Sequence, residues 1–239
     1  MPGQIVALGG GGFSMEPDNP AVDDFILSLA GSAKPRVCFL PTASADSPSY
    51  IAKFYRAFAG RAAPTDLTLF DAPALARQPA TTADLPAFVA EQEIFYVGGG
   101  NTAHLLSIWR VHGLDLLLRR AWEAGAIMAG ISAGMLCWFQ GGITDSFGGY
   151  RELNDGLALL PAVACPHYDG ESARQTVFRA MVKEHGVTGY AADDGAALHF
   201  VGTDYREAIT SRPGALAHRL THDGGTVTTT PLATRILGR

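Results

Sequence analysis

Short apolar runs alternate with amphipathic segments over the first two-thirds of the chain. Runs that are apolar on successive positions predict buried strands, and segments with apolar residues three and four apart predict helices. The predicted strands are Gln4–Leu8, Arg36–Leu40, Leu67–Phe70, Glu93–Val97 and Ala126–Ile131. The predicted helices are Pro20–Leu29, Ser49–Ala59, Leu85–Gln92 and a long stretch from Thr102 to Gly125 that is broken near His112-Gly113. This alternation is typical of an α/β protein with a mostly parallel sheet sandwiched by helices.

The last third of the chain has a different pattern. Short strand-like runs at Ala197–Phe200, Glu207–Ser211 and Thr226–Thr230 are joined by turns such as Asp223-Gly224-Gly225. We therefore expect short antiparallel C-terminal strands added to the sheet. Because no linker, repeat or low-complexity segment interrupts the chain, we expect one catalytic domain over residues 1–239.

Composition narrows the classes of function. The chain has 239 residues, a formal net charge of −5 and a pI near 5.8, which gives no electrostatic basis for nucleic-acid binding. No window approaches the roughly 20 apolar residues of a membrane helix, so we expect no membrane partner. The three cysteines form no CxxC pair, which argues against a disulfide framework or a cysteine zinc site. The first residues lack the pattern of a signal peptide, so we expect a cytoplasmic protein.

Four predicted strands end in glycine or proline turns. These turns are Gly9–Gly12, Pro41-Thr42, Gly98–Asn101 and Ser132–Gly134. The carboxyl ends of parallel strands meet at one edge of a sheet, and ligands bind there. The four turns should therefore lie around a common site.

The segment Gly130-Ile131-Ser132-Ala133-Gly134 fits the G-x-S-x-G pattern of a nucleophile elbow. In this turn a strand passes directly into a helix and presents a strained, exposed serine, and small residues on both sides let the chain cross itself. Ala126–Ile131 supplies the strand, and Met135–Phe139 is expected to supply a buried helix. The alternative is a glycine-rich turn that only packs a strand on a helix.

A serine nucleophile needs a base and an acid that orients the base. His167 follows the apolar run Leu159–Cys165 and Pro166, where a strand end would present it to a site. The acid is one of the adjacent carboxylates Asp193 and Asp194, after the run Tyr190–Ala192, or Asp145, thirteen residues after the serine. A third hypothesis makes Cys137 or Cys165 the nucleophile, although both lie in apolar runs typical of a core.

An acyl-transfer site also needs N–H donors for the oxyanion. The amide of Ala133 is one candidate, and the turn Gly98–Thr102 can supply a second. A glycine-rich turn before a helix can instead bind a phosphate. However, Gly9–Gly12 and Gly98–Gly100 lack the G-x-G-x-x-G spacing and no Walker lysine follows them, so nucleotide binding is the weaker hypothesis.

Taken in order, four motifs resemble the peptidase E (aspartyl dipeptidase) and cyanophycinase family of serine peptidases. The motifs are Gly98–Thr102, Gly130–Gly134, Cys165-Pro166-His167-Tyr168 and Asp194-Gly195. The resemblance implies a class I glutamine-amidotransferase-like α/β fold. It implies a catalytic triad of Ser132, His167 and Asp194, where the best-known aspartyl dipeptidases have Glu in place of Asp. It also implies an oxyanion donor at Gly99 or Gly100, and Asp145 as a second important acid.

The resemblance further implies a substrate. The family's dipeptidases prefer an N-terminal aspartate, whose carboxylate requires a cation such as a bidentate arginine. Arg174 matches an arginine of that region, and Asn101 is a second candidate substrate-binding residue. The expected partner is a small peptide, no metal or cofactor is required, and the sequence leaves open whether the protein forms a homodimer. The alternatives are a cyanophycinase-like enzyme, another amidase or esterase, or a non-catalytic protein that binds a small anion on the same fold.

Overall fold

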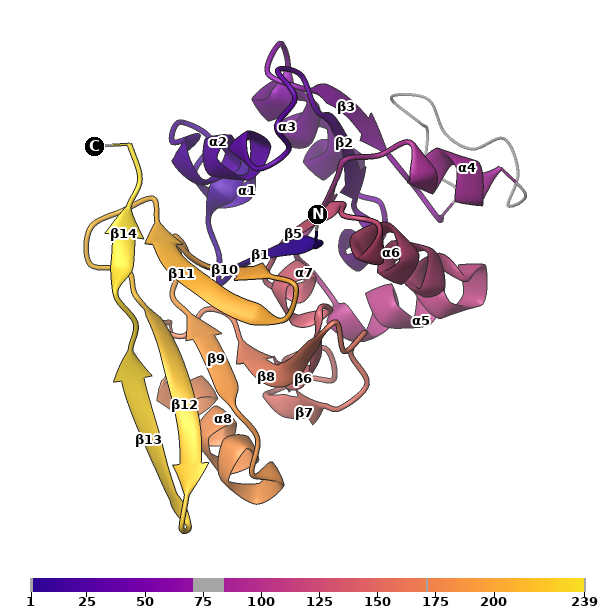
Figure 1. Cartoon of the computed structure of the whole chain (residues 1–239). Helices are drawn as coiled ribbons and strands as arrows, with labels where there is room; N and C mark the ends of the chain where they lie inside the picture. Colours follow the sequence, from indigo (N-terminus) through magenta and orange to yellow (C-terminus); the bar gives the residue numbers. More distant parts are fainter. Residues whose placement is uncertain (1, 71–83, 171, 239) are drawn as a thin grey trace.

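The computed structural model describes residues 2–70, 84–170 and 172–238, which form two β-sheets and the helices around them (Figure 1). The larger sheet has eight strands in the order β14-β11-β10-β1-β5-β4-β2-β3. The strands β1, β5, β4, β2 and β3 run parallel, and β10 joins β1 in the antiparallel direction. Its strands are β1 (Gln4–Leu8), β2 (Arg36–Leu40), β3 (Ala63–Asp66), β4 (Ile94–Val97), β5 (Ile127–Ile131), β10 (Ala196–Val201), β11 (Asp204–Thr210) and β14 (Thr234–Ile236).

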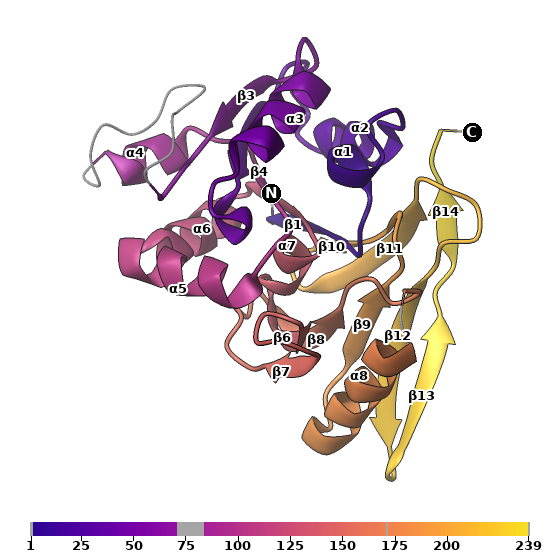
Figure 2. The ribbon, with the colours of Figure 1, turned by 180° about the vertical axis from the view of Figure 1, so that it is seen from behind.

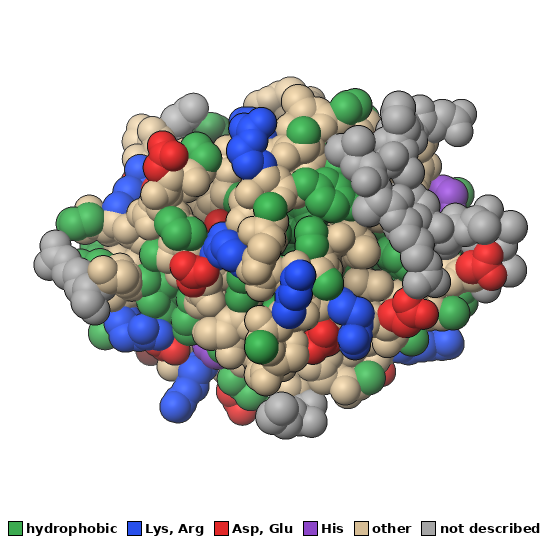
Figure 3. Space-filling model, turned by 90° about the horizontal axis from the view of Figure 1, so that it is seen from above, with side chains coloured by type: hydrophobic (Ala, Val, Ile, Leu, Met, Phe, Trp, Pro, Cys, Tyr) green, Lys and Arg blue, Asp and Glu red, His purple; other side chains and the backbone are tan. Residues whose placement is uncertain are grey.

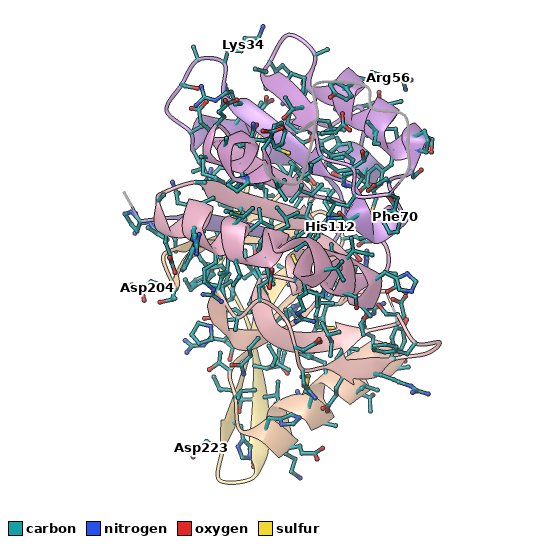
Figure 4. The ribbon with its side chains drawn as sticks, turned by 90° about the vertical axis from the view of Figure 1, so that its right-hand side faces the viewer. Lys34, Arg56, Phe70, His112, Asp204 and Asp223 are labelled. Atoms are coloured by element: carbon teal, nitrogen blue, oxygen red, sulfur yellow. The ribbon has the colours of Figure 1, made fainter. Side chains whose placement is uncertain are left out.

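The second sheet has six strands in the order β13-β12-β9-β8-β6-β7. The three strands β6, β8 and β9 are parallel, β7 and β12 pair with β6 and β9 in the antiparallel direction, and β13 pairs antiparallel with β12. The strands are β6 (Phe139–Thr144), β7 (Arg151–Leu153), β8 (Leu160–Cys165), β9 (Gly189–Ala192), β12 (Ala217–Asp223) and β13 (Thr226–Pro231). The hairpin of β12 and β13 extends away from the larger sheet, and Asp223 lies near its tip at the opposite end of the molecule from Lys34 (Figure 4).

Helices cover the sheets. They are α1 (Gly12–Met15), α2 (Ala21–Ser28), α3 (Pro48–Phe58), α4 (Leu85–Ala90), α5 (Thr102–His112), α6 (Leu114–Glu123), α7 (Ala133–Leu136) and α8 (Ser172–His185), with a 3₁₀ turn at Thr42–Ser44. The side chains of β1 alternate between two cores, as the period of a strand requires. Val6 and Leu8 pack with α1, α2 and α3, whereas Ile5 and Ala7 face the core that α4 to α7 share with the second sheet. The helix α8 packs on the second sheet through Phe178 and its neighbours (Figure 2).

Most of the predicted elements are confirmed within a few residues, and the mostly parallel sheet between helices has the predicted architecture. The break in the long helical stretch is also confirmed. Gly113 has φ 67° and separates α5 from α6. This left-handed conformation favours glycine at the end of a helix.

The predicted strand at Leu67–Phe70 is wrong. The strand is Ala63–Asp66, which pairs with Arg36–Phe39 at the edge of the sheet, where Pro64 is tolerated. The N–H groups of Leu69 and Phe70 donate to the carboxylate of Asp46 instead of to a neighbouring strand. The Asp46 side chain therefore takes the place of strand hydrogen bonds at Leu69 and Phe70. The local pattern of apolar residues does not reveal this contact.

The predicted helix at Met135–Phe139 is also wrong in its extent. The helix α7 ends at Leu136, and Phe139 begins strand β6. Phe139 pairs with Leu160 of β8, and Gly141 and Gly142 continue the pairing along that strand. Glycines in succession disfavour a helix, and a strand partner more than twenty residues away decides the outcome.

None of the helices in the described part of the chain is both long and apolar enough to cross a lipid bilayer. The face seen in Figure 3 carries basic and acidic side chains that are interspersed with apolar and neutral ones.

Two leucines of α6 allow a matched test of this packing. Leu118 is fully buried in the core that α6 shares with the larger sheet, whereas Leu116 is 58% exposed. We expect Leu118→Ala to lower the free energy of unfolding by about 2–5 kcal/mol, because it removes buried methyl groups and leaves a cavity. Leu116→Ala should change it by less than about 0.5 kcal/mol. Urea unfolding curves of both variants test the assignment, and equal losses would contradict it.

Candidate active site

The candidate nucleophile lies on a strained turn between β5 and α7. Ser132 has φ 57° and ψ −106°, which is an uncommon conformation for a residue with a side chain. A Cβ added to Gly130 would lie 2.2 Å from the carbonyl oxygen of Gly134, and a Cβ on Gly134 would lie 2.4 Å from that of Val97. Glycine is therefore required on both sides of the serine, as a nucleophile elbow demands.

A hydrogen bond links Ser132 to the candidate base. The Oγ of Ser132 lies 2.8 Å from Nε2 of His167, and both residues are half-buried. His167 follows β8 of the second sheet, and its backbone N–H donates to the carbonyl oxygen of Gly9, at the end of β1. His167 thus reaches the serine because the ends of the two sheets are joined at this point.

The acid that faces His167 is Asp194. Its Oδ1 lies 2.5 Å from Nδ1 of His167. The hydrogen bond from His167 lowers the pKa of Asp194, and the cations Arg212 and Arg174 act in the same direction. A carboxylate in this position can hold the imidazole ring in one tautomer and stabilise its cation.

Gly10 makes this contact between histidine and acid possible. A Cβ on Gly10 would lie 2.0 Å from Oδ1 of Asp194 and 3.2 Å from the ring of His167. The sequence places Gly10 in one of the four turns expected around the site but predicts no contact for it. The run Gly9–Gly12 at a strand end is the signal, because glycines let the backbone pass close to other groups.

The structure separates Asp145 from His167. Asp145 lies in the loop after β6, its side chain is 65% exposed, and its Oδ2 lies 3.8 Å from the guanidinium of Arg174. Arg174 lies on α8 with its side chain only 8% exposed and packs over the ring of Tyr150 at 4.4 Å. The structure therefore brings Asp145 together with Arg174, and Asp194 together with His167.

The predicted oxyanion donors lie beside the nucleophile but differ in their partners. A Cβ on Gly99 would be 3.5 Å from the Cβ of Ser132, so this turn borders the serine. The N–H of Gly99 already donates to the hydroxyl oxygen of Tyr50, at 3.2 Å. Among the described residues, the N–H groups of Gly100 and Ala133 have no hydrogen-bond acceptor. The N–H of Ala133 is free because Ala133 is the first residue of α7, and the first N–H groups of a helix have no acceptor within the helix. Of the three predicted donors, the N–H groups of Gly100 and Ala133 are thus the two that no described acceptor occupies.

Asn101 holds the neighbouring turn in place. Its Oδ1 accepts a hydrogen bond from the N–H of His104 at the start of α5, and its Nδ2 donates to the carbonyl oxygen of Ser146. Both ends of the amide are therefore engaged within the protein. Direct binding of substrate by Asn101 stays a prediction.

The two cysteines considered as nucleophiles lie in the core. Cys137 and Cys165 have no exposed surface. Burial raises the pKa of the Cys165 thiol to about 12 and that of Cys137 well above its usual range. A protonated, inaccessible thiol is a poor nucleophile. Across residues 2–70, 84–170 and 172–238, no group of three or more His, Cys, Asp and Glu side chains is arranged to hold a metal ion.

A serine on a strained strand-to-helix turn, hydrogen-bonded to a histidine that is itself hydrogen-bonded to a carboxylate, is the arrangement of a serine-type hydrolase. Comparison with known proteins gives the family. The family model described as "Peptidase family S51" matches residues 5–208. The chain therefore belongs to peptidase family S51, and the protein is a serine-type peptidase.

Individual relatives agree with this assignment. The "Uncharacterized peptidase YgaJ" of Bacillus subtilis (strain 168) is 46% identical over 237 residues, which cover 98% of this chain and 99% of the relative. The fold is similar to the crystal structure of a peptidase from an acI-B1 Actinobacterium, with a TM-score of 0.69 and 16% identity over 98% of this chain and 96% of the other. It is also similar to a putative peptidase E protein from Listeria monocytogenes EGD-e, with a TM-score of 0.59 and 18% identity over 97% and 99%.

The burial of the cysteines generates a test that needs no substrate. We expect Cys38, Cys137 and Cys165 to resist iodoacetamide at pH 8 in the folded protein and to react in denaturant, because all three are buried and burial raises the pKa of each thiol. Intact-mass spectrometry counts the adducts. Rapid alkylation of Cys137 or Cys165 in the folded protein would contradict the structure and favour a cysteine nucleophile.

Proposed function

We propose that this peptidase is a dipeptidase that cleaves short peptides with an N-terminal aspartate through an acyl-enzyme on Ser132. The observation that carries the proposal is the continuous hydrogen-bonded path from Ser132 Oγ to His167, at 2.8 Å, and from His167 to Asp194, at 2.5 Å. Distances of this size allow a proton to pass from the serine to the histidine while the carboxylate orients the ring.

In the acylation step, Nε2 of His167 takes the proton from Ser132 as Oγ attacks the carbonyl carbon of the scissile peptide bond. The negative charge that develops on the carbonyl oxygen is stabilised by the N–H groups of Gly100 and Ala133. His167 then donates its proton to the nitrogen of the leaving amino acid, and the C–N bond breaks. The acyl group remains as an ester on Ser132.

In the deacylation step, a water molecule takes the place of the departed amine. His167 removes a proton from this water as its oxygen attacks the ester carbonyl, and the same two N–H groups stabilise the second oxyanion. The proton returns to Oγ of Ser132, and the free carboxylic acid product leaves. Asp194 accepts the hydrogen bond from Nδ1 throughout and stabilises the imidazolium in both steps.

Arg174 is the proposed recognition residue for the aspartate side chain. Its guanidinium is nearly buried, it lies close enough to lower the pKa of Asp194, and Tyr150 supports it from one side. At 3.8 Å its ion pair with Asp145 is too long for a hydrogen bond, so N–H donors remain for a substrate carboxylate. A planar guanidinium suits two parallel hydrogen bonds to such a group.

The first test concerns the nucleophile. We expect Ser132→Ala to lower kcat for Asp-Xaa dipeptides roughly a million-fold, because members of a triad act as a unit. Asp194→Asn should cost roughly ten-thousand-fold by favouring the wrong tautomer of His167. Steady-state hydrolysis assays measure both, and Ser28→Ala on the exposed face of α2 is the control. Wild-type rates in the Ser132→Ala variant would overturn the mechanism.

The second test concerns specificity. We expect Arg174→Met to lower kcat/KM for Asp-Xaa peptides roughly ten- to hundred-fold relative to Asn-Xaa peptides, because only the former offer a carboxylate for a charge-assisted pair. Arg179→Met is the matched control, because Arg179 lies on the same helix but hydrogen-bonds to Val227 of β13. An unchanged ratio of the two substrates would contradict the role of Arg174.

A further inference from the structure

Asp194 lies in an unusual place in the chain. It belongs to the three residues that connect β9 of the six-stranded sheet to β10 of the eight-stranded sheet. Its backbone forms an isolated bridge to Gly10. A residue between two sheets lacks the regular ladder that fixes the backbone of a residue inside a strand.

Two side chains add to the backbone hydrogen bonds at this point, which run from the N–H of Ala196 to the carbonyl oxygen of Asp193 and from the N–H of Gly195 to that of Gly10. The backbone N–H of Asp194 donates to Oδ1 of Asp169, at 3.0 Å. Its carbonyl oxygen accepts a hydrogen bond from Nε of Arg212, at 2.7 Å. Asp169 comes from the turn after His167, and Arg212 comes from the segment after β11. The peptide groups on both sides of the Asp194 Cα are thus held by side chains from separate parts of the chain.

Arg212 is itself held in position. Its Nε lies 3.5 Å from Oε1 of Glu16, and the other oxygen of this carboxylate accepts a hydrogen bond from the hydroxyl of Ser211, at 2.5 Å. The guanidinium passes directly over Gly195, where a Cβ would lie 2.5 Å from Nε. Because Gly195 has no side chain, Arg212 can occupy the space next to it.

An aspartate has a single methylene between its backbone and its carboxylate, so the position of the backbone sets that of the carboxylate almost directly. We propose that Arg212 and Asp169 are positioning residues that clamp the backbone of Asp194 and so hold its carboxylate against His167. The proposed mechanism assigns neither residue a contact with substrate. The clamp acts through Asp194. It rests on the proposed function only when peptide hydrolysis is the quantity measured.

The clamp predicts two effects of its removal. Arg212→Gln loses the fixed donor to the Asp194 carbonyl and should lower kcat for an Asp-Xaa dipeptide roughly ten- to hundred-fold, the usual range for groups that orient a site residue. KM should change little, because substrate contacts remain. The proton between His167 and Asp194 gives a far-downfield NMR signal when the contact is short, and in Arg212→Gln this signal should weaken and move upfield.

Three further variants complete the test: two are controls, and the third removes the other half of the clamp. Arg235→Gln is the matched substitution, because Arg235 also pairs through Nε with a glutamate, Glu207 of β11, but has no contact with the triad among the described residues. It should leave kcat and the NMR signal unchanged. Arg212→Lys, which keeps a donor, should recover part of the loss. Asp169→Ala removes the acceptor on the other side of Asp194 and should act in the same direction as Arg212→Gln, which keeps the inference testable if that variant does not fold.

The outcomes separate the two proposals. If the wild-type protein hydrolyses no peptide, the proposed function fails, while the NMR signal of Arg212→Gln still tests the clamp. If the wild-type protein is active and Arg212→Gln retains both its kcat and its downfield signal, the clamp is wrong. An equal loss in Arg235→Gln would also overturn it, because the effect would then be a general consequence of removing a surface arginine.

Discussion

The close approach of backbone segments around Ser132 is the constraint on which the rest of the site depends. Gly130 and Gly134 let the chain fold back on itself at the nucleophile, and Gly10 leaves the space into which the carboxylate of Asp194 fits. A side chain at any of these three glycines would collide with the groups that form the site. The strained backbone of Ser132 persists because the surrounding core fixes the strand and the short helix on either side.

The site also depends on the junction of two sheets. The eight-stranded sheet supplies Ser132 and the turn with Gly100, whereas the six-stranded sheet supplies His167. Asp194 lies on the connection between them. The hydrogen bond from the His167 backbone to Gly9 and the bridge from Asp194 to Gly10 join the sheets beside the nucleophile. A displacement of one sheet against the other would therefore separate the base from the serine, so the packing between the sheets sets the geometry of the chemistry.

The sequence predicts the parts of this arrangement that have local causes. The elbow at Ser132 and the helix break at Gly113 follow from residue types at fixed spacing. Features that depend on partners far away in the chain cannot be predicted from the local sequence. The strand β6 forms because β8 lies beside it, and the pattern at Phe139 alone favours a helix. Residue patterns do not reveal that Tyr50 occupies the N–H of Gly99, since this contact joins segments far apart in the chain. They also leave Asp194 and Asp145 both open as the acid, and only the family resemblance indicates Asp194, the residue that contacts His167 in the structure.

A crystal structure of the protein after reaction with a fluorophosphonate would show the nucleophile and its oxyanion donors directly. Such a reagent forms a covalent, tetrahedral phosphorus adduct that stands in for the acylation intermediate. We expect a bond from phosphorus to Oγ of Ser132, with the phosphoryl oxygen within hydrogen-bond distance of the N–H groups of Gly100 and Ala133. We also expect His167 to stay hydrogen-bonded to Asp194. An adduct on another residue, or a phosphoryl oxygen that points away from both N–H groups, would contradict this site.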